Sequence, residues 1–172
     1  MDAQALRALQ APLKQRYRDT PAAARVVARA EARLDAAEIA CAVRAWQGET
    51  TAGLHAATGG TGALACSADM LLEALVACAG VTLRAVATAM GITLRGGRVL
   101  AEASWDARGT LGIDKSVPVG LSDIWLRFEL ETDADDAKIA RLIETTERFC
   151  VILQTLRAPP RLSVTHRAAV AG

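Results

Sequence analysis

Four cysteines are the residues of this sequence that are best suited to redox chemistry: Cys41, Cys66, Cys78 and Cys150. Cys78 lies within a strongly apolar segment, and Cys150 lies on the apolar face of a predicted second helix. Taken alone, each is most simply a small buried core residue, because free cysteine is among the most buried residue types. The two cysteines are far apart in the sequence, so their spacing does not show that they are close together. Only the fold could bring them into contact.

The other two cysteines are weaker candidates. If Cys66 and Cys78 both lie on one helix, twelve residues separate their Cα atoms by ~18 Å, whereas a disulfide requires ~7 Å or less. Cys41 is expected on a strand, in the core. In a reducing compartment all four should be thiols.

Other kinds of site lack residues at the required spacing. The two histidines form no HExxH motif and no CxxC is present, so neither a metal ion nor a cofactor is expected. The glycine-rich residues 53–62 lack the Gly-Lys-Ser/Thr of a phosphate-binding loop, which favours a flexible loop. No GxSxG motif of a serine hydrolase is present. Three neighbouring acids are expected to cap a helix: Asp133, Asp135 and Asp136.

The overall composition narrows the class of protein. Twenty basic and 19 acidic residues leave a net charge of +1, which argues against a nucleic-acid partner. Aromatic residues make up only 3%, so the core must be built from small aliphatic side chains, which mildly favours an oligomer. The N-terminal residues are charged throughout and do not resemble a secretory signal. The most apolar run, residues 74–81, is far shorter than a membrane span of ~20 residues, so a cytoplasmic protein without a membrane partner is expected.

The order of the predicted elements indicates one α+β domain over residues 1–172. Residues 1–20 form a leading helical extension. Residues 26–34 alternate as a strand would, although an Ala/Arg-rich helix remains the alternative. A buried helix is expected over residues 68–90, capped by Ser67. The remaining predictions are strands at 38–46, 92–95, 98–107, 124–131 and 162–166, and a helix that begins at Thr132 or Asp133 and carries Cys150 on its apolar face.

Two blocks of sequence resemble the OsmC/Ohr family. Residues 67–84 are similar to that family's first cysteine helix, in which a Pro-acid-Leu-Leu segment leads into Ala-Leu-x-x-Cys and then Thr-Leu-Arg. Residues 147–156 are similar to its second cysteine segment, which typically reads Cys-Pro-Val-x-x-Thr-Leu. The glycines at 59–62 also occupy a position where the family often has them. The resemblance covers roughly residues 22–170.

This resemblance implies an intertwined homodimer in which antiparallel sheet wraps two central cysteine-bearing helices. It implies reduction of organic hydroperoxides, with Cys78 as the peroxidatic residue and Cys150 as the resolving residue. Arg33 best matches the family's catalytic arginine, and Arg29 is second. An external dithiol of the lipoyl type would act as the reductant.

The sequence departs from the family pattern at two positions. Ten residues before Cys78, the hydroperoxide reductases usually carry Glu, whereas this chain has Ala68, with Asp69 one place later. Val151 replaces the proline that usually follows the second cysteine. These departures favour a branch of OsmC-like proteins outside the dedicated hydroperoxide reductases. The alternative function is therefore a non-enzymatic OsmC-like protein that binds a small molecule or senses oxidation.

Overall fold

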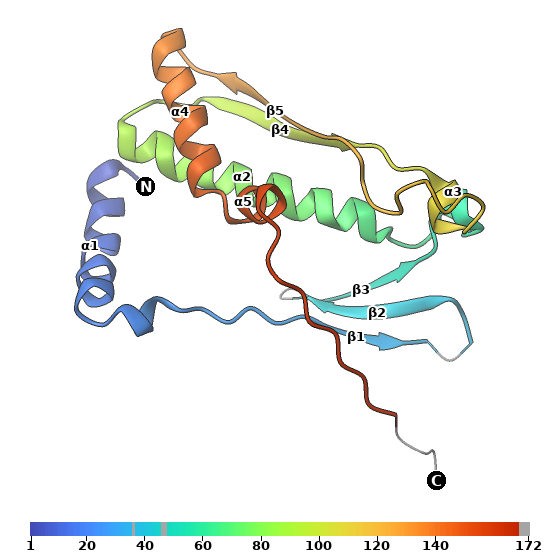
Figure 1. Cartoon of the computed structure of the whole chain (residues 1–172). Coiled ribbons are helices and arrows are strands. Elements are labelled where there is room, and N and C mark those ends of the chain that lie inside the picture. The colour runs from blue at the N-terminus through green and yellow to red at the C-terminus, as the bar shows by residue number, and fades with distance from the viewer. Residues whose placement is uncertain (36, 46–47, 169–172) are drawn as a thin grey trace.

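The computed structural model describes residues 1–35, 37–45 and 48–168. Helices and antiparallel sheets occupy separate parts of the molecule, so the fold is α+β as predicted (Figure 1). The helices are α1 (Ala3–Asp19), α2 (Ser67–Met90), α3 (Ala107–Thr110), α4 (Asp136–Phe149) and α5 (Val151–Arg157). The strands are β1 (Glu31–Leu34), β2 (Ala40–Ala45), β3 (Gly48–Gly53), β4 (Gly96–Ala103) and β5 (Ile124–Glu131), and short 3₁₀ turns lie at Pro21–Ala24 (η1) and Ala56–Thr58 (η2).

The long helix α2 runs through the middle of the molecule (Figure 1). Its buried residues recur every fourth position, which is the period of one helix face: Leu75, Ala79, Leu83 and Ala87. Gly91 ends the helix in the left-handed conformation, with φ at 68°, and its N–H bonds the last carbonyls of the helix. The two alanines of the buried face are small, and β4 and α4 both pack against the helix.

The main core lies where α2 meets α4 and the β4–β5 hairpin. Leu83, Ala87, Leu94 and Leu142 form its buried centre. Phe128 and Leu130 of β5 close it from the strand side. This core fixes α4, and therefore the chain that follows α4, relative to α2.

The two sheets differ in how they are covered. β4 and β5 pair in antiparallel register, with Gly96 opposite Glu131 and Ala103 opposite Ile124, and they pack on α2. The three strands β1–β2–β3 form a separate meander, which is tied to the start of α2 through a bridge between Ala52 and Ala65. Every residue of β1 is exposed. The protomer therefore leaves one of its sheets largely open.

α2 is also long and apolar enough to cross a membrane by length and composition alone. The sequence reasoning missed this, because it considered only the run at 74–81. In the most apolar part of α2, 22% of the residues are buried within the protomer.

Several sequence-based boundaries were wrong. Residues 162–166 are extended but pair with no strand among the described residues. Residues 92–95 form no strand, and β1 begins at Glu31 instead of near residue 26. The strand predicted at 98–107 runs over 96–103, and β3 was not predicted. The last residue of the strand predicted at 38–46 lies outside the described residues. Cys66, and not Ser67, occupies the cap of α2, and Asp135 caps α4 by accepting from the Lys138 N–H.

Candidate active site

Cys78 and Cys150 meet where α2 passes the corner between α4 and α5. Cys78 is half-buried on α2. α4 ends at Phe149 and α5 begins at Val151, so Cys150 is the hinge residue and not, as predicted, part of the helix face. Its own N–H donates to the Thr146 carbonyl at 2.9 Å, and its carbonyl accepts from the Gln154 N–H at 2.9 Å. The fully buried Cys150 side chain is hydrogen-bonded to the Cys78 sulfur.

The surroundings of Cys78 favour its thiolate. Burial alone would raise the pKa of this thiol, but the N–H of Ile152, the Cys150 thiol, the N–H of Val151 and the Thr82 hydroxyl all donate toward the sulfur. Together these donors hold the pKa of Cys78 below its usual value. Two of them are the first N–H groups of α5, which have no partner within that helix.

Cys150 has the opposite tendency. Burial raises the pKa of its thiol, the N–H of Leu153 opposes that rise, and the neighbouring Cys78 raises it further. When two thiols share a site, the negative charge on one disfavours ionisation of the other. Of the two thiols, Cys78 is therefore the one that ionises more readily. This pair can form a disulfide after one sulfur is oxidised.

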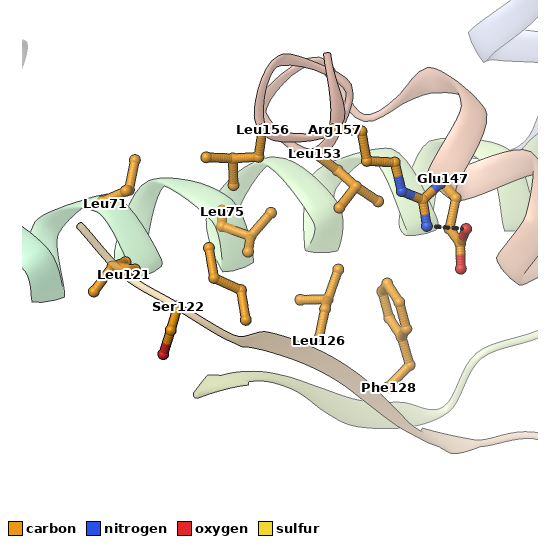
Figure 2. Close-up of a pocket in the computed structure, with 11 residues that line it drawn as sticks. Leu71, Leu75, Leu121, Ser122, Leu126, Phe128, Glu147, Leu153, Leu156 and Arg157 are labelled. Atoms are coloured by element: carbon orange, nitrogen blue, oxygen red, sulfur yellow. Dashed lines mark hydrogen bonds and ion pairs between the residues drawn. The ribbon is translucent and has the colours of Figure 1, made fainter. Parts of the chain in front are cut away.

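A leucine-rich cavity of about 610 Å³ opens between α2, α5 and β5 (Figure 2), and neither Cys78 nor Cys150 is among its lining residues. Leu75 of α2 and Leu153 of α5 project into it, each three residues from a cysteine. Leu71 lies at one end and Phe128 toward the other (Figure 2). The cavity is lined further by Leu121, Ser122, Ile124, Leu126 and Leu156. Its lining suits the hydrocarbon part of a small ligand.

The polar end of this cavity is an ion pair that the sequence reasoning did not find. Arg157 Nη2 lies 2.7 Å from Glu147 Oε2, and both residues line the cavity (Figure 2). Gln154 Nε2 also donates to the Glu147 carbonyl at 2.8 Å. Glu147 could have been identified from the sequence as a residue near the site, because it lies one helical turn before Cys150. Arg157 could be connected to it only by knowing that the chain turns at Cys150.

Arg33 lies elsewhere in the protomer. It sits on β1, opposite Ala42 of β2, and its guanidinium bonds Glu49 of β3 at 2.8 Å. Its side chain is 65% exposed. The described protomer thus pairs Arg33 with a carboxylate on the open sheet, so its role at the thiols remains a prediction.

The remaining predicted features are placed as follows. Cys66 caps α2 and lines a second cavity with Ala68 and His55. Cys41 lies on β2, opposite Ala52, and is only partly buried. Across the described ranges no group of three or more His, Cys, Asp or Glu side chains gathers as metal ligands would.

The profile of the OsmC-like protein family matches residues 60–165, which include both cysteines of the candidate site. The chain belongs to the OsmC-like protein family. Since α2 falls within the matched residues, its apolar character is part of the family fold and not that of a separate membrane span. No curated protein sequence matches the chain at a significant level.

Solved structures of OsmC-like proteins share the fold at low sequence identity. An OsmC-like protein from Mycoplasma pneumoniae superposes with a TM-score of 0.65 at 21% identity, covering 78% of this chain and 89% of that one. An organic hydroperoxide resistance protein from Elizabethkingia anophelis gives 0.62 at 16% identity, covering 78% and 92%. An organic hydroperoxide resistance protein OsmC from Legionella pneumophila gives 0.57 at 14% identity, covering 78% and 93%. These likenesses establish the OsmC/Ohr fold.

Proposed function

We propose that this OsmC-like protein is a thiol peroxidase that reduces organic hydroperoxides through Cys78 and Cys150. The observation that carries the proposal is the contact between the two sulfurs, with the first N–H groups of α5 directed at Cys78. A thiolate is the species that attacks a peroxide, and hydrogen-bond donors increase its population at neutral pH. Homologous structures described as organic hydroperoxide resistance proteins support a role in peroxide resistance.

The reaction balances in three steps. The Cys78 thiolate attacks the distal oxygen of the hydroperoxide, the O–O bond breaks, and the alkoxide leaves as an alcohol after taking up a proton. Cys78 becomes a sulfenic acid. The Cys150 thiol then attacks the Cys78 sulfur, releasing water and forming the Cys78–Cys150 disulfide. An external dithiol, for which the lipoyl type is the leading candidate, reduces this disulfide and is itself oxidised to a disulfide.

The cavity that Leu75 and Leu153 line, one helical turn from Cys78 and Cys150, favours an organic hydroperoxide over hydrogen peroxide. Its leucine-rich lining gains free energy by covering an alkyl or aryl group, whereas hydrogen peroxide offers no such surface. Arg33 remains part of the proposal as a cation that approaches the site in the assembled protein. We place the protein in the cytoplasm, where its thiols stay reduced between turnovers.

A homodimer is the second part of the proposal. A compact monomer of 18.1 kDa exposes about 8,100 Å². This protomer exposes 13360 Å², an excess that matches its open sheet and the uncovered face of α2. An intertwined partner that covers both surfaces accounts for the excess. We expect the active site to be complete only in that dimer.

Peroxide consumption tests the proposed function. Purified protein is mixed with cumene hydroperoxide and dihydrolipoamide, and peroxide loss is followed for wild type, Cys78→Ser and Cys150→Ser. We expect turnover to fall by roughly a thousandfold or more in Cys78→Ser, because the nucleophile is gone. Cys150→Ser should accumulate a sulfenic acid on Cys78 that dimedone traps. The double variant Cys41→Ser/Cys66→Ser is the control and should keep wild-type turnover. Turnover that survives in Cys78→Ser would refute the proposal.

A second candidate function is supported by two observations. Ala68 stands where a hydroperoxide reductase would carry Glu, and Arg33 is bonded to Glu49. A protein that forms the disulfide once but does not cycle would be a thiol sensor. The same assay separates the two functions, because a sensor consumes one equivalent of peroxide and then stops even with dithiol present.

A further inference from the structure

Two polar contacts tie α5 to the last turn of α4. Arg157 pairs with Glu147 at 2.7 Å, and Gln154 Nε2 donates to the Glu147 carbonyl at 2.8 Å. Glu147 thus receives bonds from two side chains of the following helix, one on its carboxylate and one on its carbonyl. These contacts span the corner that carries Cys150. We call Glu147, Gln154 and Arg157 the corner brace.

We propose that the corner brace positions α5 so that the Cys150 thiol and the first N–H groups of α5 stay in contact with the sulfur of Cys78. The inference rests on the proposed function, in which Cys78 is the attacking sulfur. The three residues act through α5, so they are positioning residues and not catalytic ones.

α5 needs such a brace because it is not stable by itself. It has seven residues, and isolated helices of this length do not persist in water. Cys150 makes no side-chain hydrogen bond as its cap. Val151 fills the first helical position, where a proline would fix φ at its helical value, and valine leaves that angle free. The orientation of α5 therefore depends on tertiary contacts.

The apolar side of α5 supplies only part of those contacts. Leu153 and Leu156 face the cavity, which is open space and not packed core. All residues of α5 are exposed or only partly buried. Sliding or rotation of α5 is opposed in addition by the bonds to Glu147. Loss of Arg157 should therefore displace the N–H groups of Val151 and Ile152 from the Cys78 sulfur.

A generic surface ion pair is the competing explanation for Arg157 and Glu147. Their side chains are 53% and 35% exposed, and pairs with that exposure contribute little to stability. Arg98 and Glu129 form a similar pair on the β4–β5 hairpin, with side chains 70% and 37% exposed. The Arg98 pair therefore gives a matched control. A brace must change the chemistry of Cys78, whereas a generic pair must not.

The test measures alkylation of Cys78 by iodoacetamide as a function of pH, resolved by mass spectrometry on the reduced full-length protein without peroxide. For Arg157→Ala and Glu147→Gln we expect Cys78 to react about threefold more slowly at pH 7, with the profile moved to higher pH. Arg157→Lys should recover part of the loss, because a lysine can still reach the carboxylate. Arg98→Ala should leave the profile unchanged.

Each outcome decides for or against the proposed corner brace. An unchanged pH profile of Cys78 alkylation in Arg157→Ala would overturn the proposal. A change of equal size in Arg98→Ala would also overturn it. If Arg157→Ala does not fold, Gln154→Ala is measured instead, and an unchanged profile there also overturns it. The readout needs no peroxide, so an altered profile in a protein without peroxide turnover would uphold the brace and refute the proposed function. Peroxide turnover in the wild type, together with an unaltered Cys78 alkylation profile in Arg157→Ala, would uphold the proposed function and refute the brace.

Discussion

At the Cys78 sulfur, burial and hydrogen bonding act in opposite directions. Burial disfavours the thiolate, whereas donors from α2, α5 and Cys150 stabilise it, and the donors prevail. These donors are neutral groups, so this stabilisation does not require a cation. Burial raises the pKa of Cys150, and the neighbouring Cys78 raises it further. These opposite shifts support the proposed division of roles, with Cys78 as the nucleophile and Cys150 as the resolving thiol.

The opposite shifts predict the order in which the two thiols react with an alkylating agent. The pKa of Cys78 is lowered, so its thiolate forms first as pH rises, and Cys150 ionises at higher pH. At pH 7 we expect iodoacetamide to modify Cys78 at least about tenfold faster than Cys150. Site-resolved mass spectrometry across pH 6–10 checks this. Faster labelling of Cys150 would contradict the assigned roles.

Substitutions at Cys150 separate its hydrogen bond from its redox role. Cys150→Ala removes the side-chain donor to Cys78, so the pKa of Cys78 should rise and its alkylation at pH 7 should slow. Cys150→Ser keeps a hydroxyl donor and should stay closer to wild type. Neither variant can form the disulfide. Equal alkylation profiles for the two variants would show that the Cys150 side chain does not stabilise the thiolate.

At the scale of elements, the connection from β3 to α2 is more ordered than its glycine content suggests. The sequence favoured a flexible loop over residues 53–62. In the structure, the Gly53 N–H bonds the Ala65 carbonyl at 3.0 Å, and the Gly60 N–H bonds the His55 carbonyl at 3.1 Å. A Cβ at Gly60 would lie 1.7 Å from the Leu54 carbonyl oxygen, so only glycine fits. This loop leads directly into the cap of α2.

Gly60→Ala should therefore destabilise the protein. The clash is with backbone and cannot be relieved by rotating a side chain, so we expect a loss of roughly 1–3 kcal/mol in the free energy of unfolding. Gly120→Ala is the matched control, since a Cβ there meets nothing within 4 Å. It should change stability by less than about 1 kcal/mol. Urea denaturation followed by circular dichroism compares the two, and equal stabilities would refute the steric argument.

The sequence predicted those elements whose patterns were dense and locally complete. Residues 68–90 combine many apolar residues with a glycine stop, and α2 matches them closely. The corner at Cys150 was missed for a physical reason. The apolar pattern continues from Phe149 into Val151 and Ile152 with no glycine or proline, so it reads as one helix. Only the backbone shows the break, where Cys150 adopts φ −73° and ψ 106°.

The strand predicted at 162–166 failed for a different reason. Its residues alternate as a strand would and the chain there is extended, but a strand also needs a neighbour, and none pairs with it in the described protomer. The local sequence indicates whether a segment prefers an extended conformation, but it does not indicate whether a neighbouring strand is available for pairing. In Figure 1 this segment runs away from the helices toward the C-terminus. An extended tail and an open β1–β3 sheet are what an intertwined dimer would use.

At the scale of the whole molecule, the uncovered face of α2 is an apolar surface that nothing in the described protomer covers. Val81 lies in the middle of the helix and is 73% exposed. Ala74 and Ala77 extend the same exposed face toward the N-terminal end of α2. Small side chains permit close approach of a second helix, and the exposed apolar area favours it. We therefore expect the two α2 helices of a dimer to pack against each other there.

This expectation yields a test of the assembly. Wild type should sediment at twice its mass of 18.1 kDa, and Val81→Arg should be largely monomeric, because an unpaired charge at a helix–helix contact would weaken the dimer by roughly a hundredfold or more. Ile113→Arg, at a position that is 70% exposed but lies outside α2, should remain a dimer. Analytical ultracentrifugation measures all three proteins, and circular dichroism verifies that each is folded. A dimeric Val81→Arg would place the contact elsewhere. A monomeric wild type would leave the exposed sheet, the open α2 face and the extended tail without the partner on which the proposed active site depends.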